Sequence, residues 1–295
     1  MEIQNKFAGE DTHFQVHNSL NCSGSLFDLS TPKIMGILNV TPDSFHDGGR
    51  YLTEKESITR ASEMLKEGAD ILDIGGQSTR PGAARISSAD EWGRVGNAVK
   101  AIVKEFPSAI LSIDTFYADV ADKALSEGVS IVNDISAGAF DEKIMGVAAR
   151  HNAPYILMHM QGNPATMQLE PAYTNVVNEV MDFFVTKIAQ LKSAGVRDIV
   201  LDPGFGFGKT TEHNYSLLSN LSLFRMTGYP VMAGLSRKSM ITKVLKVPNE
   251  AALNGTTVLN TIALLQGASI LRVHDIKEAA ETRALITEYK RVQKS

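Results

Sequence analysis

The sequence is poor in cysteine and lacks long apolar runs, and both absences limit the classes of protein that it can encode. Cys22 is the single cysteine among 295 residues, so an intrachain disulfide is excluded and a reducing compartment is favoured. No apolar run approaches the ~20 residues that a membrane-spanning helix needs. Residues 1–18 contain acidic groups and no apolar core, unlike a secretory signal. We therefore expect a cytoplasmic protein without a membrane partner.

Positive charge is also scarce. The chain has 29 Lys and Arg residues against 33 Asp and Glu residues, for a formal net charge of -4. This balance gives no support to binding of nucleic acid. No linker or low-complexity segment divides residues 22–295, so we expect one globular domain there. Residues 1–21 are polar and unpatterned, and they are predicted to be a flexible tail or a strap across the floor of the domain.

Glycine and proline alternate along the chain as the starting points of eight apolar segments. Four segments follow a glycine that ends a helical stretch: Gly68, Gly128, Gly195 and Gly267. The other four follow a proline: Pro32, Pro107, Pro154 and Pro230. Glycine suits the left-handed position that closes a helix, and proline precedes new elements. Continuous Ile/Leu/Val runs between helices are typical of parallel strands buried on both faces. The sequence therefore predicts an α/β fold, a (β/α)8 TIM barrel in a single domain, with an open doubly wound sheet as the alternative.

Nearly every predicted strand ends on a polar or charged residue, and in a barrel these ends share one rim. The cationic members are Arg80, Arg237, Lys238, Arg272 and His274. The acidic and amide members are Asp114, Asn133 and Asp202, and the rim also includes Asn39, Thr79, Asp134, His159 and Ser236. Cations gathered on an acidic protein favour an anionic substrate such as a phosphate or pyrophosphate. The carboxylates and amides suit the N–C–NH2 edge of a flat ring, and Phe205 and Phe207 offer aromatic faces.

Three motif-based functions are not supported. Residues 204–210 end like a phosphate-binding loop, but Pro203 stands where that pattern requires its first glycine. No His/Cys/Asp cluster has the spacing of a structural zinc site. No serine lies in a G-x-S-x-G turn, so a hydrolase triad has no candidate nucleophile of that type.

Seven stretches in order along the chain closely resemble dihydropteroate synthases. They are MGILNVTPDSFHDGG (35–49), DIGGQSTRPGA (73–83), SIDT (112–115), VNDISAG (132–138), DPGFGFGK (202–209), GLSRKSMI (234–241) and RVHD (272–275). The resemblance implies condensation of 6-hydroxymethyl-7,8-dihydropterin pyrophosphate with p-aminobenzoate, giving 7,8-dihydropteroate and pyrophosphate for folate biosynthesis. It also implies a homodimer that uses Mg²⁺ and is inhibited by sulfonamides. Gln77 and His46 depart from the usual Glu and Ser of the family.

The resemblance also implies roles for individual residues. Pterin would be bound by Asp114, Asn133, Ile135, Met158, Asp202, Phe207, Gly234 and Lys238. Pyrophosphate would be bound by Asn39, Arg80, Arg272 and His274, with Asn39 also holding Mg²⁺. The p-aminobenzoate pocket would contain Phe45, Thr79, Pro81, Phe207, Ser236 and Lys238, with Asp43 in the same loops. The residues expected to act in catalysis are Arg80, Lys238, Arg272, His274 and Asp47.

We expect a dissociative reaction in which pyrophosphate leaves before the amine attacks. Three other functions compete with this interpretation. A pterin-binding methyltransferase of the same superfamily has no pyrophosphate to hold, and the basic STRPG, SRK and RVHD segments argue against it. A catalytically silent pterin-binding paralogue would have lost a catalytic position, and none is lost. A sugar-phosphate aldolase would need a Schiff-base lysine, for which Lys238 is the sole candidate.

Overall fold

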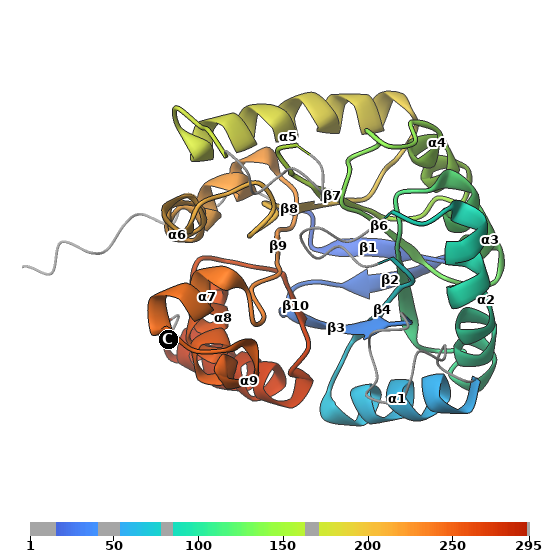
Figure 1. Ribbon diagram of the computed structural model, residues 1–295, viewed down its shortest axis with the longest axis horizontal. Helices are drawn as coiled ribbons and strands as arrows, with labels where there is room; N and C mark the ends of the chain where they lie inside the picture. Colours follow the sequence, from blue (N-terminus) through green and yellow to red (C-terminus); the bar gives the residue numbers. More distant parts are fainter. Residues whose placement is uncertain (1–15, 41–53, 78–84, 163–170, 294–295) are drawn as a thin grey trace, which may run out of the picture.

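Eight parallel strands form a barrel surrounded by helices in the computed structural model (Figure 1), which describes residues 16–40, 54–77, 85–162 and 171–293. The barrel strands are β3 (Lys33–Asn39), β4 (Ile71–Gly75), β5 (Ile110–Asp114), β6 (Ile131–Asp134), β7 (Tyr155–Met158), β8 (Ile199–Asp202), β9 (Met232–Ala233) and β10 (Ile270–Val273). Their order in the sheet is β8-β7-β6-β5-β4-β3-β10-β9. This order confirms the predicted (β/α)8 barrel.

The barrel closes between β8 and β9. One parallel bridge joins Leu201 to Val231, and the Leu201 N–H donates to the Pro230 carbonyl at 2.9 Å. β9 has only two residues, so this seam has fewer ladder hydrogen bonds than the joint of β3 and β4, which pairs five residues of each strand.

Helices follow the strands and cover the outside of the barrel (Figure 1). They are α1 (Glu54–Glu67), α2 (Ser88–Glu105), α3 (Ala118–Ser126), α4 (Lys143–Arg150), α5 (Val176–Ser193), α6 (Thr211–Ser219), α7 (Ser239–Leu245), α8 (Leu253–Leu265) and α9 (Ile276–Gln293), with 3-10 turns η2 (Leu221–Thr227) and η3 (Asn249–Ala251). The four glycines predicted to end helices have φ angles between 88° and 113°: Gly68, Gly128, Gly195 and Gly267. These left-handed positions explain why glycine precedes these strands.

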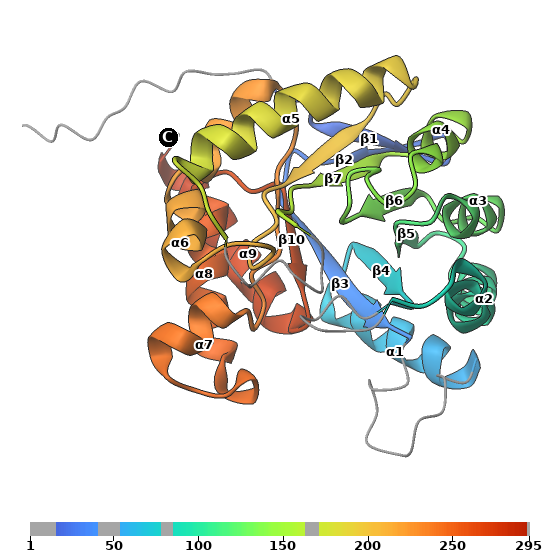
Figure 2. The same cartoon turned by 45° about the horizontal axis from the view of Figure 1, so that its top comes forward.

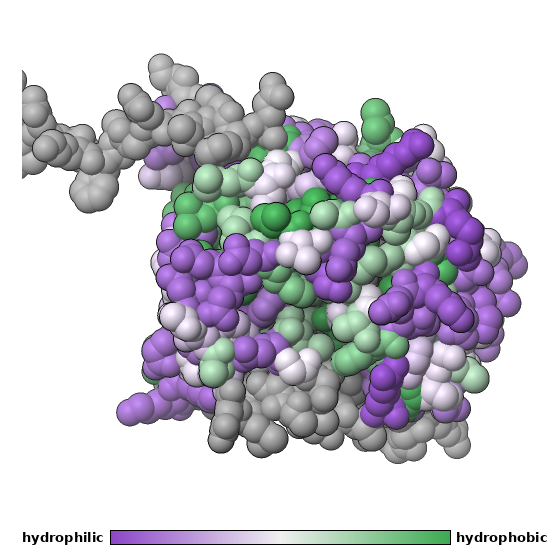
Figure 3. Space-filling view, turned by 90° about the horizontal axis from the view of Figure 1, so that it is seen from above, coloured by the Kyte–Doolittle hydropathy of each residue, from purple (hydrophilic) through white to green (hydrophobic). Residues whose placement is uncertain are grey.

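The surface in Figure 3 mixes hydrophilic residues with smaller hydrophobic areas. None of the helices in the described part of the chain combines the length and apolarity that crossing a bilayer requires.

The floor of the barrel, at the N-terminal ends of the strands, is an apolar layer. Its inward-facing members are Met35, Ile71, Ile131, Ile156, Val200, Met232 and Ile270. An antiparallel hairpin of β1 (Ser19–Cys22) and β2 (Ser25–Asp28) covers this layer and adds Leu20, Cys22 and Leu29 to it (Figures 1 and 2). Burial raises the pKa of the Cys22 thiol to about 12, so it stays protonated at neutral pH.

The hairpin starts inside residues 1–21, the segment predicted to be a flexible tail or a strap across the floor. Ser19, Leu20 and Asn21 belong to β1, and the Asn21 N–H donates to Asp198 Oδ2 at 2.9 Å. The ordered domain thus begins before residue 22, because Leu20 is buried against the floor. Residues 1–15 lie outside the described residues.

Candidate active site

The mouth of the barrel, at the C-terminal ends of the strands, reverses the chemistry of the floor. Side chains alternate between the two faces of a strand, so residues two apart point the same way. Ile71 lies in the floor layer, and Asp73, two residues further along β4, is 1% exposed. Asn133 stands in the same relation to Ile131, and Asp202 to Val200. The inward-facing positions therefore change from apolar to polar within two residues.

Arg272 of β10 joins two carboxylates of the mouth. Its Nε donates to Asp73 Oδ2 at 2.7 Å, and its terminal nitrogen donates to Asp114 Oδ2 at 2.6 Å. The Asn133 amide donates to the same Asp73 oxygen at 3.0 Å. This network links β4, β5, β6 and β10. Buried charges need such partners because an unpaired one is strongly unfavourable.

The charge states in this network follow from burial and pairing. Burial raises the pKa of Asp114 to about 7, although the Arg272 guanidinium opposes the shift. Burial also acts to lower the pKa of Arg272, but Asp73 and Asp114 outweigh it and raise that pKa above its usual value. Arg272 is therefore a permanent cation, whereas Asp114 titrates near neutral pH.

Gly75 leaves space beside two oxygen-bearing side chains. A Cβ atom at Gly75 would lie 3.7 Å from Asn39 Oδ1 and 3.6 Å from Asp114 Oδ2. Asn39 ends β3 and Asp114 ends β5, on either side of β4. These two oxygens thus flank one point of the mouth.

Asp202 and Lys238 lie across the seam between β8 and β9. Asp202 Oδ1 accepts from the Gly204 N–H at 2.8 Å, and burial raises its pKa while the Lys238 cation opposes the rise. Lys238 Nζ donates to the Phe205 carbonyl and lies 4.8 Å from the centre of the Phe207 ring. Burial lowers the pKa of Lys238 to about 8, against the pull of Asp202.

Gly234 leaves room between the two inward-facing cations. A Cβ atom there would lie 3.8 Å from Lys238 Nζ and 3.9 Å from Arg272 Cβ. The Arg272 charge also acts on Asp202. Asp202 and Arg272 consequently lie at the same mouth, as predicted, although Arg272 stands among the carboxylates rather than on a separate flank.

An apolar wall adjoins these polar groups. Phe116, Ile135 and Met158 form a buried cluster. Phe207 packs against it as a partly buried member, together with Tyr117, Phe140 and Met160. Three predicted pterin-binding residues, Ile135, Met158 and Phe207, are thereby brought together.

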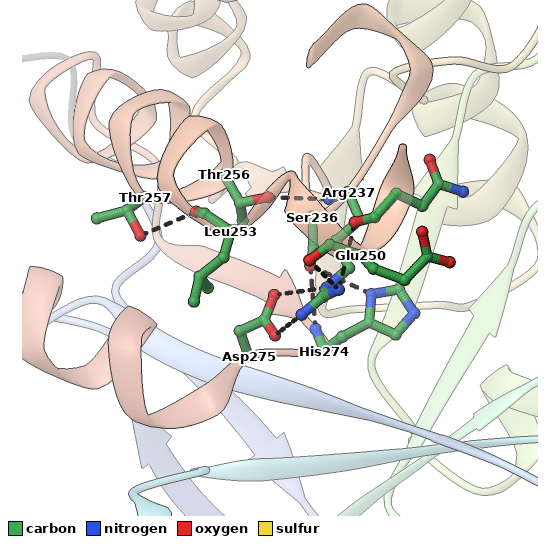
Figure 4. A network of polar contacts seen from close by, with 9 residues as sticks. Ser236, Arg237, Glu250, Leu253, Thr256, Thr257, His274 and Asp275 are labelled. Carbon is green, nitrogen blue, oxygen red and sulfur yellow. Dashed lines mark hydrogen bonds and ion pairs between the residues drawn. The ribbon is translucent and has the colours of Figure 1, made fainter. Parts of the chain in front are cut away.

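Ser236 and His274 contact each other at the ends of β9 and β10 (Figure 4). The His274 N–H donates to Ser236 Oγ at 3.2 Å, and His274 Nδ1 lies 3.2 Å from the same oxygen. The adjoining Arg237 has a left-handed backbone, with φ at 56°. It forms two hydrogen bonds to Asp275, at 3.0 Å and 2.6 Å.

Arg237, a predicted cation of the rim, has its partners within the chain. Its guanidinium also donates to the carbonyls of Asn249 and Glu250, at 3.3 Å and 3.4 Å, and is held by the chain itself (Figure 4). Its guanidinium is therefore held by one carboxylate and two backbone carbonyls. Its contacts join the β9–α7 segment to the start of α9 and keep Ser236 beside His274.

Two other predicted rim residues point outward, because each follows an inward-facing neighbour. Asp134 comes after Asn133 and accepts from the Tyr155 hydroxyl and the Gly138 N–H. His159 comes after Met158, and its ring lies 4.8 Å from that of Phe183 on α5. Both residues hold loops around the mouth.

Several predicted site residues lie outside the described residues, namely Asp43, Phe45, Asp47, Thr79, Arg80 and Pro81, as does the family departure His46. Their roles stay predictions. Gln77 is described and buried, and its Oε1 accepts from the Ile86 N–H at 3.2 Å.

Sequence reasoning missed Asp73 and Lys209. Asp73 lies in the middle of its strand, whereas the predicted rim residues lie at strand ends. Because side chains alternate along a strand, Asp73 faces the same side as Gly75 and is therefore inward-facing. In the sequence, Lys209 stands out only as part of a pattern that resembles a phosphate-binding loop. Its surroundings depend on how three glycines turn the chain, which residue types alone do not specify.

Comparisons with known proteins agree with this geometry. A family model described as "Pterin binding enzyme" matches residues 35–274. The dihydropteroate synthase of Escherichia coli (strain K12) is 44% identical over 269 residues, covering 90% of this chain and 95% of that protein. The Haemophilus influenzae dihydropteroate synthase is 43% identical over 264 residues, covering 89% and 95%.

Solved structures give the same result. The Yersinia pestis dihydropteroate synthase, determined with a sulfonamide drug complex, has a TM-score of 0.88 and 41% identity, covering 92% of this chain and 99% of that one. The Xanthomonas albilineans dihydropteroate synthase with 4-aminobenzoic acid has a TM-score of 0.86 and 36% identity, covering 92% and 98%. With its barrel, its mouth of paired acids and cations, and relatives similar over 90% of its length, the chain belongs to the pterin-binding enzyme family, among the transferases called dihydropteroate synthases.

Proposed function

We propose that this chain condenses 6-hydroxymethyl-7,8-dihydropterin pyrophosphate with p-aminobenzoate, forming 7,8-dihydropteroate and pyrophosphate. The observation that carries the proposal is the placement of Asp114, Asn133 and Asp202 at one mouth with Lys238 and Arg272. A flat heterocycle rich in N–H groups and bearing an anionic tail matches both kinds of group. The Xanthomonas albilineans relative determined with 4-aminobenzoic acid supports the choice of second substrate.

The pterin ring would be recognised by charged hydrogen-bonding groups and an apolar wall. Asp202 and Asn133 present oxygens to ring N–H groups, and a hydrogen bond to the charged Asp202 contributes about 1.5–3 kcal/mol. Lys238 presents donors to ring acceptors. Ile135, Met158 and Phe207 pack against the faces of the ring. The aromatic and apolar side chains would also exclude water from a reactive ring cation.

The chemical step breaks the bond between the pterin CH2 carbon and the bridging pyrophosphate oxygen. The electron pair of that bond leaves with pyrophosphate, and the ring delocalises the positive charge that remains on carbon. The lone pair of the aryl amine then forms the new C–N bond, and the amine releases one proton to solvent. Arg272 and His274, together with Arg80, would stabilise the departing negative charge, while Asp114 and Asp202 favour the cationic pterin.

Mg²⁺ fits this site through its preference for oxygen ligands. Asn39 Oδ1 borders the space at Gly75, opposite the Asp114 oxygen that Arg272 holds. Among the described residues no group of three or more His, Cys, Asp or Glu side chains could hold a metal. This donor set suits Mg²⁺, which commonly keeps several waters and binds one or two protein groups plus substrate phosphates. When bound, Mg²⁺ would neutralise charge on the pyrophosphate.

The direct test is to incubate the purified protein with dihydropterin pyrophosphate, p-aminobenzoate and Mg²⁺, and to follow dihydropteroate and pyrophosphate by chromatography. We expect both products in equal amounts, and their loss when the metal is chelated. Pterin binding without any product would refute the proposal and indicate a silent paralogue. Methyl transfer to an acceptor in place of pyrophosphate release would indicate a methyltransferase.

We further propose that the protein is a cytoplasmic homodimer. Of the eleven exposed large hydrophobic side chains in the described segments, seven lie on the last three helices: Val244, Leu245, Val258, Leu265, Leu285, Tyr289 and Val292. Exposed apolar side chains concentrated on neighbouring helices favour association. Size-exclusion chromatography with light scattering should give twice the chain mass of 32.0 kDa, and a monomer at micromolar concentration would contradict the proposal.

A further inference from the structure

Lys209 is a buried cation that lies inside its own glycine-rich loop. Lys209 is only 3% exposed. Its Nζ donates to the carbonyls of Gly204 at 3.0 Å, Phe207 at 2.9 Å and His159 at 3.2 Å, and lies 3.0 Å from His159 Nδ1. The ammonium thus ties the β8–α6 loop to the β7–α5 loop.

Three glycines shape the loop around this ammonium. Gly204, Gly206 and Gly208 have φ angles of 67°, 83° and 62°, in the left-handed region. A Cβ atom at Gly204 would lie 1.9 Å from the His159 carbonyl oxygen, so no other residue fits there without movement. A phosphate-binding loop directs N–H groups inward, whereas this loop directs carbonyls at a cation. The resemblance of residues 204–210 to a phosphate loop therefore ends at the residue types.

The surroundings of Lys209 lower the pKa values of both Lys209 and His159. Burial lowers the pKa of Lys209 to about 7, while Asp202 raises it and Lys238 lowers it. Burial and the Lys209 charge lower the pKa of His159 to about 3, so its ring is neutral and can accept a hydrogen bond. The three carbonyls would each lose a hydrogen-bond partner if the ammonium were removed, and a buried carbonyl without a partner is unfavourable.

The same loop carries groups that form the pterin pocket. The Gly204 N–H donates to Asp202, the Phe205 carbonyl accepts from Lys238, and the Phe207 ring lies against Lys238. Lys209 holds Gly204 and Phe207, the residues on either side of the Lys238 contact. The two buried lysines therefore hold three carbonyls of one short segment, one lysine from inside the loop and one from the mouth.

We propose that Lys209 is a positioning residue for the pterin site, which fixes Phe207 and Lys238 relative to Asp202 without touching the substrate. This inference rests on the proposed function, because it assigns Phe207, Lys238 and Asp202 to the pterin. It adds a residue that none of the site predictions contains. The role predicts a selective loss of pterin affinity when the ammonium is removed.

The test compares Lys209→Met with Lys192→Met, which removes an exposed lysine on α5. Titration calorimetry with 6-hydroxymethylpterin measures the site without turnover. We expect Lys209→Met to weaken pterin binding about tenfold, corresponding to about 1.4 kcal/mol, with a matching rise in KM for the pterin substrate. Lys192→Met should match wild type. Pterin affinity within twofold of wild type in Lys209→Met would overturn the inference.

A second variant separates positioning from folding. Lys209→Gln keeps neutral donors for part of the carbonyl set and should bind pterin with intermediate affinity. A purely structural role would instead lower the melting temperature and the active fraction, with KM unchanged. Failure of both variants to fold would also overturn the inference, since Lys209 would then hold the fold rather than the site. Wild-type protein that binds pterin without forming product would refute the proposed function and leave this test valid.

Discussion

The floor and the mouth of the barrel are built from the same strands, but the floor is apolar and the mouth is charged. At the floor, inward-facing side chains such as Met35 and Ile156 meet Leu20 of the hairpin in an apolar layer. At the mouth, Asp73 and Arg272 occupy inward-facing positions and are held by ion pairs. Apolar burial stabilises the fold, whereas buried charge is costly and persists where it is paired or used.

Stability and chemistry are therefore separated along the barrel axis by two residues of a strand, as from Ile71 to Asp73. Substitutions at the floor should therefore change unfolding, and substitutions at the mouth should change turnover. Each variant below tests one side of this separation.

The largest effect is expected at the floor, for Leu20→Ala. Leu20 is 1% exposed, and truncating a buried leucine costs about 2–5 kcal/mol of unfolding free energy, since transfer and cavity terms add. Urea denaturation should show this loss, while kcat and KM of the folded enzyme match wild type. A changed kcat at full folding would show that the hairpin influences the mouth.

Arg272→Ala should have the next largest effect, at the mouth. Loss of one group that stabilises developing charge lowers kcat by about 10²-fold or more. The matched control is Arg283→Ala, because Arg283 pairs with Asp70 at the start of β4, near the floor. Stopped assays at saturating substrate should show near-normal turnover for the control, and near-normal turnover of Arg272→Ala would remove Arg272 from the mechanism.

Asp202→Asn should weaken pterin binding while leaving the fold intact. The change removes one buried negative charge, and a hydrogen bond to a charged group is worth about 1.5–3 kcal/mol, or at least tenfold in affinity. Calorimetry with 6-hydroxymethylpterin measures the loss. Unchanged affinity would refute the assignment of Asp202 to the pterin ring.

Glu91→Gln, behind the mouth, should change the pH dependence of stability rather than turnover. Glu91 is fully buried in α2 beside Gly76, and burial raises its pKa to about 8. Between pH 4.5 and about 8 the folded state keeps a proton that the unfolded state has released, so stability falls as pH rises. The neutral amide of Glu91→Gln should remove the part of this loss of stability that is due to Glu91. Denaturation curves across that range that are parallel for both proteins would contradict the prediction.

Much of the barrel could be predicted because its signals are local. Gly68, Gly128 and Pro154 mark where helices end and strands begin, and the apolar runs after them need both faces covered. The two strands of the hairpin were not predicted, because β1 contains residues such as Ser19 and Asn21 that are equally common in loops. Only the apolar floor beneath it makes Leu20 a core residue.

The site was predicted less completely, because its contacts depend on the side of each strand. Asp134 and Asn133 are neighbours in sequence, yet one holds a loop and the other faces the mouth. Arg237 and Lys238 are also neighbours in sequence, yet Arg237 pairs with Asp275 and Lys238 contacts the Phe205 carbonyl at the mouth. Strand alternation could have separated the first pair. The left-handed backbone of Arg237 has no sequence signal of its own.

The seam between β8 and β9 gives the barrel a preferred line of opening. Asp202 borders it on one side, and Gly234 and Lys238 follow on the other. Local opening takes least free energy where backbone pairing is sparse. We expect deuterium to enter amides along this line sooner than those of β4 or β5, and fluctuations there to widen the entrance for a bulky heterocycle without melting the remaining sheet.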